Sequence, residues 1–291
     1  MQKCDELLNQ LLEPERLTAV VDIGANPIDG DPPYHEMLRK GLCTVTGFEP
    51  QPEALASLLQ RKGPLERYLP NVVGDGSDHV LYVAQSSGMT SLLEPDPARL
   101  ALFNGFTDWG TVRERFTTPT TRLDDLGEVG QMDLLKIDVQ GGELMVFQGG
   151  REKLRGAVAV QTEVSFVPLY KEQPTLGDID AELRRQGFLP HAMTALKRWA
   201  IAPVIYDGDF RRPMHQLLEA DLVYVRDFTD PDHFSSEQLQ HLALVAHHVY
   251  GSSDLVHLCL LALARRSLVR LDAPATYLAS WAAAVRQRSS C

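Results

Sequence analysis

Short apolar runs along the chain alternate with segments whose apolar residues fall on one helical face. Runs rich in Val, Ile and Leu predict strands that are buried on both faces, because such strands show no polar alternation. We expect strands at residues 19–23, 44–49, 71–73, 79–84, 133–139, 157–163 and 220–225. Helical patterns lie at residues 5–17, 53–61, 97–103 and 178–186, whereas the rest of 86–122 has no regular pattern. This alternation predicts an α/β fold with a mostly parallel sheet.

After Pro231 only helices are expected. Ser235 and Gln238 fit a capping box that opens one helix, and residues 254–271 and 275–287 are also helical in pattern. We therefore divide the chain into an N-terminal helix (1–17), an α/β domain (18–230) and a helical C-terminal extension (231–291). Leucines of this extension form an apolar surface that packs either on the core or on a second subunit, in which case the chain is a homo-oligomer: Leu255, Leu258, Leu261, Leu263, Leu268 and Leu271.

Charge and cysteine content narrow the class of protein. The 291 residues carry a formal net charge of -11, which disfavours a nucleic-acid backbone as partner. The cysteines, with no metal-ligand spacing, are expected to be free thiols in a reducing compartment: Cys4, Cys43, Cys259 and Cys291. The N-terminus lacks the apolar run of a signal peptide, and the apolar stretch at residues 258–264 is too short to span a bilayer. We expect a soluble cytoplasmic protein without a membrane partner.

The first strand leads into a loop that suggests a nucleotide site. In open α/β sheets, ligands bind beyond the carboxyl ends of the strands. Gly24 lets the backbone approach a ligand, and Asp22 can accept a hydrogen bond from an ammonium group or align the loop. Glu49, at the end of the second strand, is placed to accept both hydroxyls of a ribose. This pattern fits an adenosyl cofactor and NAD equally.

The glycines of the loop favour the adenosyl cofactor. A dinucleotide site needs G-x-G-x-x-G, because the pyrophosphate sits on backbone N–H groups at the helix start. The loop offers only Gly24 and Gly30, and it places Asp29 and Asp31 where phosphates would lie. Two carboxylates disfavour a pyrophosphate and tolerate a cationic sulfonium. The following helix is expected to begin with Asp31 as its cap.

Four segments together resemble one known family. They read Val-Asp-Ile-Gly-Ala-Asn (21–26), Phe-Glu-Pro (48–50), Thr-Arg-Leu-Asp-Asp-Leu (121–126) and Asp-Leu-Leu-Lys-Ile-Asp-Val-Gln-Gly-Gly-Glu (133–143). They are similar to the FkbM family of S-adenosylmethionine-dependent methyltransferases, over residues 18–228. The last segment is the most specific of the four.

The resemblance implies a Rossmann-like class I methyltransferase fold, with a mostly parallel seven-stranded sheet and one antiparallel strand. It also implies S-adenosyl-L-methionine as cofactor and O-methylation of a hydroxyl on a small molecule, sugar or natural product. Asp22, Gly24, Asn26 and Glu49 are the expected cofactor-binding residues. The loop from Pro27 to Pro33 departs from the family pattern.

Asp138 and Glu163 end adjacent strands, so their carboxylates are expected in one crevice. Three interpretations stay open. They shape and polarise the acceptor pocket, they hold a divalent cation such as Mg²⁺ that orients the acceptor oxygen, or they only pair with Lys136, Lys171 or the backbone.

A hydroxyl acceptor also needs a base. His215, before the strand at 220–225, is one candidate, and His35, past the cofactor loop, is another. The remaining histidines of the tail are expected at the surface or an interface: His241, His247, His248 and His257. Asp75 either binds the adenine amino group or only forms a polar turn. Residues 86–91 and 103–109 either form a lid or a surface loop.

Two other classes of function compete with the methyltransferase. A nicotinamide-dependent oxidoreductase is disfavoured by the missing glycines and by the two loop carboxylates. A degenerate methyltransferase fold that serves as a scaffold is disfavoured by the retained Asp22, Gly24, Glu49 and Asp138.

Overall fold

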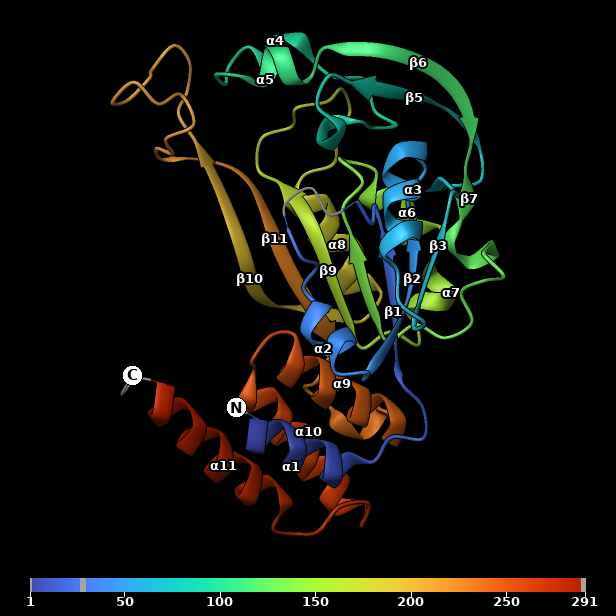
Figure 1. Ribbon diagram of the computed structural model, residues 1–291, viewed down its shortest axis with the longest axis vertical. Helices are drawn as coiled ribbons and strands as arrows, with labels where there is room; N and C mark the ends of the chain where they lie inside the picture. The colour runs from blue at the N-terminus through green and yellow to red at the C-terminus, as the bar shows by residue number, and fades with distance from the viewer. Residues whose placement is uncertain (1, 27–29, 289–291) are drawn as a thin grey trace.

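A seven-stranded sheet forms the centre of the computed structural model, which describes residues 2–26 and 30–288 (Figure 1). The strands follow the order β10-β11-β9-β8-β1-β2-β3. Their bounds are β1 Thr18–Ile23, β2 Cys43–Phe48, β3 Glu66–Leu69, β8 Leu134–Ile137, β9 Ala159–Ser165, β10 Phe188–Trp199 and β11 Gln216–Arg226. All pairs from β9 to β3 are parallel, and β11 is antiparallel to both of its neighbours. The predicted sheet, mostly parallel with one antiparallel strand, is confirmed.

Both faces of this sheet are covered by helices, which explains the continuous apolar runs in its central strands. On one face Val21, Leu135 and Val160 pack with three helices. These are α6 (Glu143–Gln148), α7 (Arg151–Leu154) and α8 (Leu176–Arg185), and the expected helix at 178–186 matches α8. On the other face Val20 and Leu134 pack with α2 (His35–Arg39) and with the C-terminal helices. α3 (Pro52–Arg61) follows β2, as predicted.

The first helix and the C-terminal helices share one layer at the amino ends of the strands, at the bottom of the view (Figure 1). They are α1 (Gln2–Leu12), η3 (Pro231–His233), α9 (Ser236–His248), α10 (Ser253–Arg265) and α11 (Ala273–Arg288). Leu8 of α1 belongs to the same apolar cluster as Leu255 and Leu263 of α10. The extension therefore packs on its own core, the first of the two alternatives, although Leu268 and Leu271 stay exposed. The capping box of Ser235 and Gln238 is confirmed.

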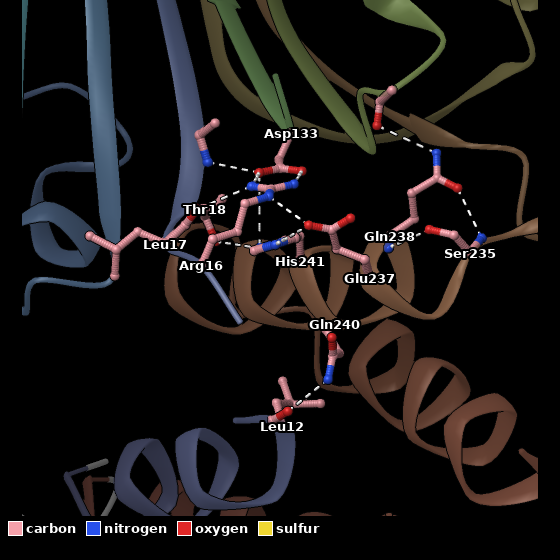
Figure 2. A network of polar contacts seen from close by, with 12 residues as sticks. Leu12, Arg16, Leu17, Thr18, Asp133, Ser235, Glu237, Gln238, Gln240 and His241 are labelled. Carbon is pink, nitrogen blue, oxygen red and sulfur yellow. Dashed lines mark hydrogen bonds and ion pairs between the residues drawn. The ribbon is translucent and has the colours of Figure 1, made fainter. Parts of the chain in front are cut away.

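Asp133 joins this helical layer to the sheet (Figure 2). Its two carboxylate oxygens accept hydrogen bonds from the Arg16 guanidinium at 2.6 and 2.9 Å, and one also accepts from the Ala19 N–H at 2.7 Å. The Arg16 Nε donates to Glu237 of α9 at 2.6 Å. Asp133 is only 2% exposed, so β1, β8 and α9 are held together by a largely desolvated ion pair.

The segment between β3 and β8 forms a layer above the carboxyl ends of the strands (Figure 1). It contains β4 (Val73–Gly74) paired with β7 (Thr121–Arg122), and β5 (Asp78–Ala84) paired with β6 (Val112–Pro119). Short helices complete it: η1 (Ser87–Met89), α4 (Pro97–Leu100), α5 (Phe106–Trp109) and η2 (Leu123–Asp125). Phe106 packs edge-on against Trp199 of β10, with ring centroids 5.1 Å apart. The segment at 103–109 is thus a packed element over the sheet edge.

Several local expectations were wrong. The third strand of the main sheet is β3, not residues 71–73; the alternation of Glu66-Arg67-Tyr68-Leu69 at the sheet edge is too polar to resemble a buried strand. Residues 86–122 were expected to be irregular except for one helix, but they contain β6, whose side chains are mostly exposed. The helix after the loop begins at His35 rather than at Asp31. Pro27, Ile28 and Asp29 lie outside the described residues, as does Cys291.

Other expectations concern single residues. Cys4, Cys43 and Cys259 are buried free thiols, as expected. His241 and His247 are 0% and 6% exposed, so they lie at contacts between elements of the chain rather than at the surface, the other expected position. Within the described parts of the chain, no helix combines the length and the apolar character needed to cross a membrane.

Candidate active site

The end of β1 and the end of β8 meet at Gly24. The Asp138 N–H donates to the Ile23 carbonyl at 3.0 Å, and the backbone turns at Gly24 with φ +79°. An ideal Cβ at this position would lie 1.9 Å from the Asp138 carbonyl oxygen, so only glycine fits. The glycine predicted to bring the backbone close to a ligand therefore also brings the ends of β1 and β8 together.

Asp22 is buried beneath this turn and is held on two sides. The Tyr34 hydroxyl donates to Asp22 Oδ2 at 2.6 Å, and the Lys136 ammonium lies 3.2 Å from Oδ1 as an ion pair. Lys136 Nζ also donates to the Gly24 carbonyl at 3.0 Å. Burial raises the pKa of Asp22, which Lys136 and Tyr34 oppose. Within the described residues, the ammonium group that Asp22 contacts belongs to Lys136. This ion pair aligns the Gly24 turn, because Lys136 also donates to the Gly24 carbonyl.

Glu49 comes directly after β2 and is 2% exposed. Its Oε1 accepts a hydrogen bond from the Gln51 N–H at 2.7 Å, and the Asn26 backbone also donates to the carboxylate. Burial raises the pKa of Glu49 despite these two backbone donors. Asn26 and Glu49, two of the predicted cofactor residues, are thus in contact at adjacent strand ends.

Asp138 and Glu163 are brought together, as expected, and Gln140 lies between them. The Gln140 amide nitrogen donates to Asp138 Oδ1 at 2.8 Å and to Glu163 Oε2 at 3.1 Å. Gln140 has φ +55°, and its carbonyl accepts from the Ser91 hydroxyl at 2.7 Å. Its amide oxygen lies 3.4 Å from the Tyr170 hydroxyl. The side chain of Gln140 therefore sets the distance between the two carboxylates.

A second charged pair borders Glu163. Lys197 of β10 donates to Glu219 of β11 at 2.5 Å and lies 4.0 Å from Glu163. Burial raises the pKa of Glu163 well above its usual range, and the neighbouring Glu219 and Asp138 add to this effect. A carboxylate with a raised pKa is a stronger base, which suits a group that accepts a proton near neutral pH.

Glu143 shapes the loop that carries these groups. Its Oε1 accepts hydrogen bonds from the N–H groups of Val139 at 2.9 Å and of Gly141 at 3.3 Å. Burial and the charge of Asp138 raise the pKa of Glu143 to about 7. Because Gln140 lies between the two donors, Glu143 fixes the backbone that directs the Gln140 side chain.

The three interpretations of Asp138 and Glu163 can now be compared with their contacts. Lys136 pairs with Asp22, and Lys171 pairs with Glu94 at 2.8 Å, so neither lysine is the ion-pair partner expected for Asp138 or Glu163. An NH₂ donor rather than a cation connects the two carboxylates. Within residues 2–26 and 30–288, three convergent metal-ligand side chains occur at Asp5, His247 and His248, not at this site. Nothing in the described residues supports the Mg²⁺ alternative.

The two base candidates have different surroundings. His215 is exposed in the bend before β11, and no carboxylate in the described ranges pairs with it. His35 begins α2 and is 43% exposed in its side chain, with Asp31 at 3.9 Å. Neither contacts Asp138 or Glu163 in the described structure, so both remain predictions.

Asp75 lies apart from Glu49, in the turn between β4 and β5. Its Oδ1 accepts from the Ser77 N–H at 2.8 Å and contacts His79 Nε2 at 2.9 Å. The hydrogen bond with His79 lowers the pKa of Asp75. The residue borders a cleft of about 1110 Å³ whose wall also includes Gly141 and Gly142. The contacts of Asp75 are therefore those of a polar turn, and a contact with the adenine amino group stays a prediction.

The sequence of this region matches a known domain. The Methyltransferase FkbM domain aligns with residues 22–190, which is more than half of the chain. The chain belongs to the FkbM methyltransferase family. This match includes Gly24, Glu49 and Asp138, which directly follow β1, β2 and β8, and Glu163, which lies near the end of the adjacent β9.

A curated relative and two solved structures are similar to this family member. The 2-O-methyltransferase NoeI of Sinorhizobium fredii (strain NBRC 101917 / NGR234) is 28% identical over 162 residues, which cover 53% of this chain and 66% of NoeI, just under two thirds of its length. Magnesium protoporphyrin IX methyltransferase of Synechocystis PCC 6803, with bound SAM, is 13% identical with a TM-score of 0.37, over 77% of this chain and 78% of that chain. Precorrin-6y C5,15-methyltransferase of Geobacter metallireducens GS-15 is 12% identical with a TM-score of 0.36, over 77% and 89%. Scores this low carry no argument.

Sequence reasoning missed several residues that organise the site. Tyr34, Lys197 and Glu219 were not predicted, because their partners lie on elements whose pairing is not visible in the sequence. Gln140 was also missed, although its partners Asp138 and Glu163 were predicted. Gln140 stands inside the most specific motif, two residues after Asp138, and this position was a usable signal.

Proposed function

We propose that this protein is an S-adenosylmethionine-dependent methyltransferase that acts on a hydroxyl group of a small molecule, sugar or natural product. The observation that carries the proposal is the junction of β1, β2 and β8. There, the Gly24 turn lies directly against Asp138, and a buried Glu49 stands at the end of the neighbouring strand. Family membership and the curated O-methyltransferase relative support the same activity.

The residues at this junction fit the proposed cofactor. Asp22 Oδ1 is buried and has an ion-pair contact but no hydrogen bond within the described part of the chain. Glu49 offers a fixed carboxylate for a ribose diol, because two backbone N–H groups already orient it. Carboxylates around the edge suit a sulfonium better than a pyrophosphate. When bound, the cofactor would supply an electrophilic methyl group.

The acceptor hydroxyl would meet Asp138 and Glu163. An enzyme for this displacement mainly aligns the acceptor oxygen and removes its proton. Glu163 is the candidate proton acceptor, since its pKa is raised by burial, and Lys197 at 4.0 Å favours the ionised carboxylate that must be present before the proton is taken up. Asp138 and Gln140 would orient the hydroxyl by hydrogen bonds. The net charge of -11 favours a small molecule or glycan over a nucleic acid as acceptor.

Transfer of an isotopically labelled methyl group tests the proposal. The full chain is incubated with ¹³C-methyl S-adenosylmethionine and a mixture of methyl glycosides, and the products are identified by NMR. We expect O-methyl resonances that Glu163→Gln lowers at least tenfold, because one misplaced or missing base costs about that much or more. Glu152→Gln, which removes an exposed carboxylate of α7 paired with Arg155, serves as control. Labelled N-methyl or S-methyl products from other acceptor mixtures, with none at oxygen, would overturn the assignment to hydroxyls.

A further inference from the structure

The helical layer contains a second group of convergent polar side chains, at the opposite end of the sheet from Asp138. Asp5 and Asn9 lie one turn apart on α1, and His247 and His248 end α9. His247 Nε2 is 2.9 Å from Asp5 Oδ1, and His248 Nε2 is 3.2 Å from Asn9 Oδ1. One ligand atom each from Asp5, His247 and His248 lie within 4.8 Å of one another. Two imidazoles therefore face a carboxylate and an amide oxygen across one helix interface.

The outer atoms of these side chains have their own partners. Lys40 Nζ donates to Asp5 Oδ2 at 2.7 Å, which leaves Oδ1 toward the histidines. The Tyr277 hydroxyl lies 2.9 Å from His247 Nδ1, on the far side of the ring from Asp5. Such second contacts orient ligands in metal sites and fix the imidazole tautomer.

The site is also shielded from solvent. His247 is 6% exposed, which limits competition from water for a bound cation.

We propose that Asp5, His247 and His248 bind a Zn²⁺ ion that joins α1 to α9, with the Asn9 amide oxygen as fourth ligand. Two nitrogen and two oxygen ligands suit tetrahedral Zn²⁺ rather than Mg²⁺ or Ca²⁺, which prefer oxygen ligands alone. Zn–N and Zn–O bonds of about 2.0–2.1 Å place tetrahedral ligand atoms about 3.3 Å apart. The observed 2.9 and 3.2 Å contacts need to widen by a few tenths of an ångström, and any ligand atoms as far as 4.8 Å apart must move closer.

The ion connects residues that are 242 positions apart in the chain. Its effect is therefore on the attachment of the first helix to the last three, and it does not depend on the proposed methyl transfer. The single carboxylate is shared with Lys40, which predicts weaker binding than at a site whose ligands have no competing cation.

Titration of the full chain with Zn²⁺ and Co²⁺ tests this site. We expect one bound ion per chain, a tetrahedral Co²⁺ absorption spectrum, and a rise of about 5 °C in the unfolding midpoint with Zn²⁺ well above its dissociation constant, reversed by chelation. His248→Gln is expected to weaken binding at least tenfold and to abolish the Co²⁺ spectrum. The control His257→Gln changes a histidine of α10 whose Nδ1 contacts the Pro274 carbonyl at 3.2 Å, and binding should be retained.

Asp5→Asn provides a second test that conserves size, should His248→Gln fail to fold. Circular dichroism without metal establishes that each variant is folded before it is titrated. Absence of a Co²⁺ spectrum and of any midpoint shift with excess Zn²⁺ in the wild-type chain would overturn the proposal. So would equal losses of binding in His248→Gln and His257→Gln. Chelation that leaves methyl transfer unchanged but lowers the midpoint would separate this site from the active site.

Discussion

Gly24→Ala is the most informative substitution in the proposed cofactor site. Two effects contribute to its cost. The backbone angle φ of +79° disfavours any residue with a Cβ, by about 1–2 kcal/mol. The new Cβ would also lie 1.9 Å from the Asp138 carbonyl oxygen, so the ends of β1 and β8 must separate. Overpacking of this kind costs about 1–3 kcal/mol more.

Gly41→Ala isolates the second effect. Gly41 has a similar φ of +69°, but nothing lies within 4 Å of an ideal Cβ there. We expect Gly41→Ala to lower the free energy of unfolding by about 1–2 kcal/mol, the conformational cost alone. Gly24→Ala should cost about 2–5 kcal/mol, the sum of the two effects.

Urea unfolding followed by circular dichroism measures both values, and calorimetry with S-adenosylhomocysteine measures binding. Gly41→Ala should bind like the wild type, whereas Gly24→Ala should bind at least tenfold more weakly, because the turn beside Asp138 is displaced. Equal losses of stability in the two variants would refute the close approach. Unchanged binding by a folded Gly24→Ala would refute its role at the cofactor.

Further predictions concern the loop after β8 and the link to the helical layer. The carboxyl group of Glu143 has a pKa of about 7 in the folded protein and 4.5 in the unfolded chain, so it contributes about 3 kcal/mol to the free energy of unfolding below pH 4.5, and this contribution is lost as the pH rises through 7. Glu143→Gln should make the urea midpoint less dependent on pH over this range, and an unchanged pH dependence would count against this. Gln140→Leu should lower kcat/KM about tenfold, since one charge-assisted hydrogen bond is worth about 1.5 kcal/mol, and should shift the pH profile; unchanged kinetics would exclude a positioning role. Asp133→Ala should cost about 2–4 kcal/mol by leaving Arg16 with only Glu237, whereas Glu237→Ala, at an exposed pair, should cost under about 1 kcal/mol; equal costs would contradict the assigned burial.

The strands that could be predicted from the sequence are those that are buried on both faces of the sheet. Val20–Ile23 and Leu134–Ile137 are covered on both faces, and this leaves runs that are apolar in the sequence except at Asp22 and Lys136. β3 and β6 were missed because an edge strand and a solvent-exposed ribbon need no such run. Their partners, β2 and β5, determine their structure, and pairing between strands is not a local property of the chain.

Some residues of the candidate site could likewise be predicted from the sequence, and others could not. Gly24, Glu49, Asp138 and Glu163 could be placed because each lies within one residue of the end of a predicted strand, and parallel strands end at one edge. Lys197 could not, since it lies on a strand whose register with β11 is interrupted by bulges. The partners of the tail histidines could not be predicted for a related reason. His241 contacts Thr18 at 2.9 Å, and a partner 223 residues away leaves no signal in a helical pattern.

Binding of S-adenosylhomocysteine to Glu49→Gln, compared with the wild type, tests the central claim most directly. The amide keeps the size and the backbone contacts of Glu49 but loses the charge that would accept both ribose hydroxyls. We predict that the wild type binds S-adenosylhomocysteine and not NAD, and that Glu49→Gln binds at least tenfold more weakly, since each hydrogen bond to a charged group contributes about 1.5–3 kcal/mol. Wild-type protein that binds NAD but not S-adenosylhomocysteine, or a folded Glu49→Gln with unchanged affinity, would contradict the assignment.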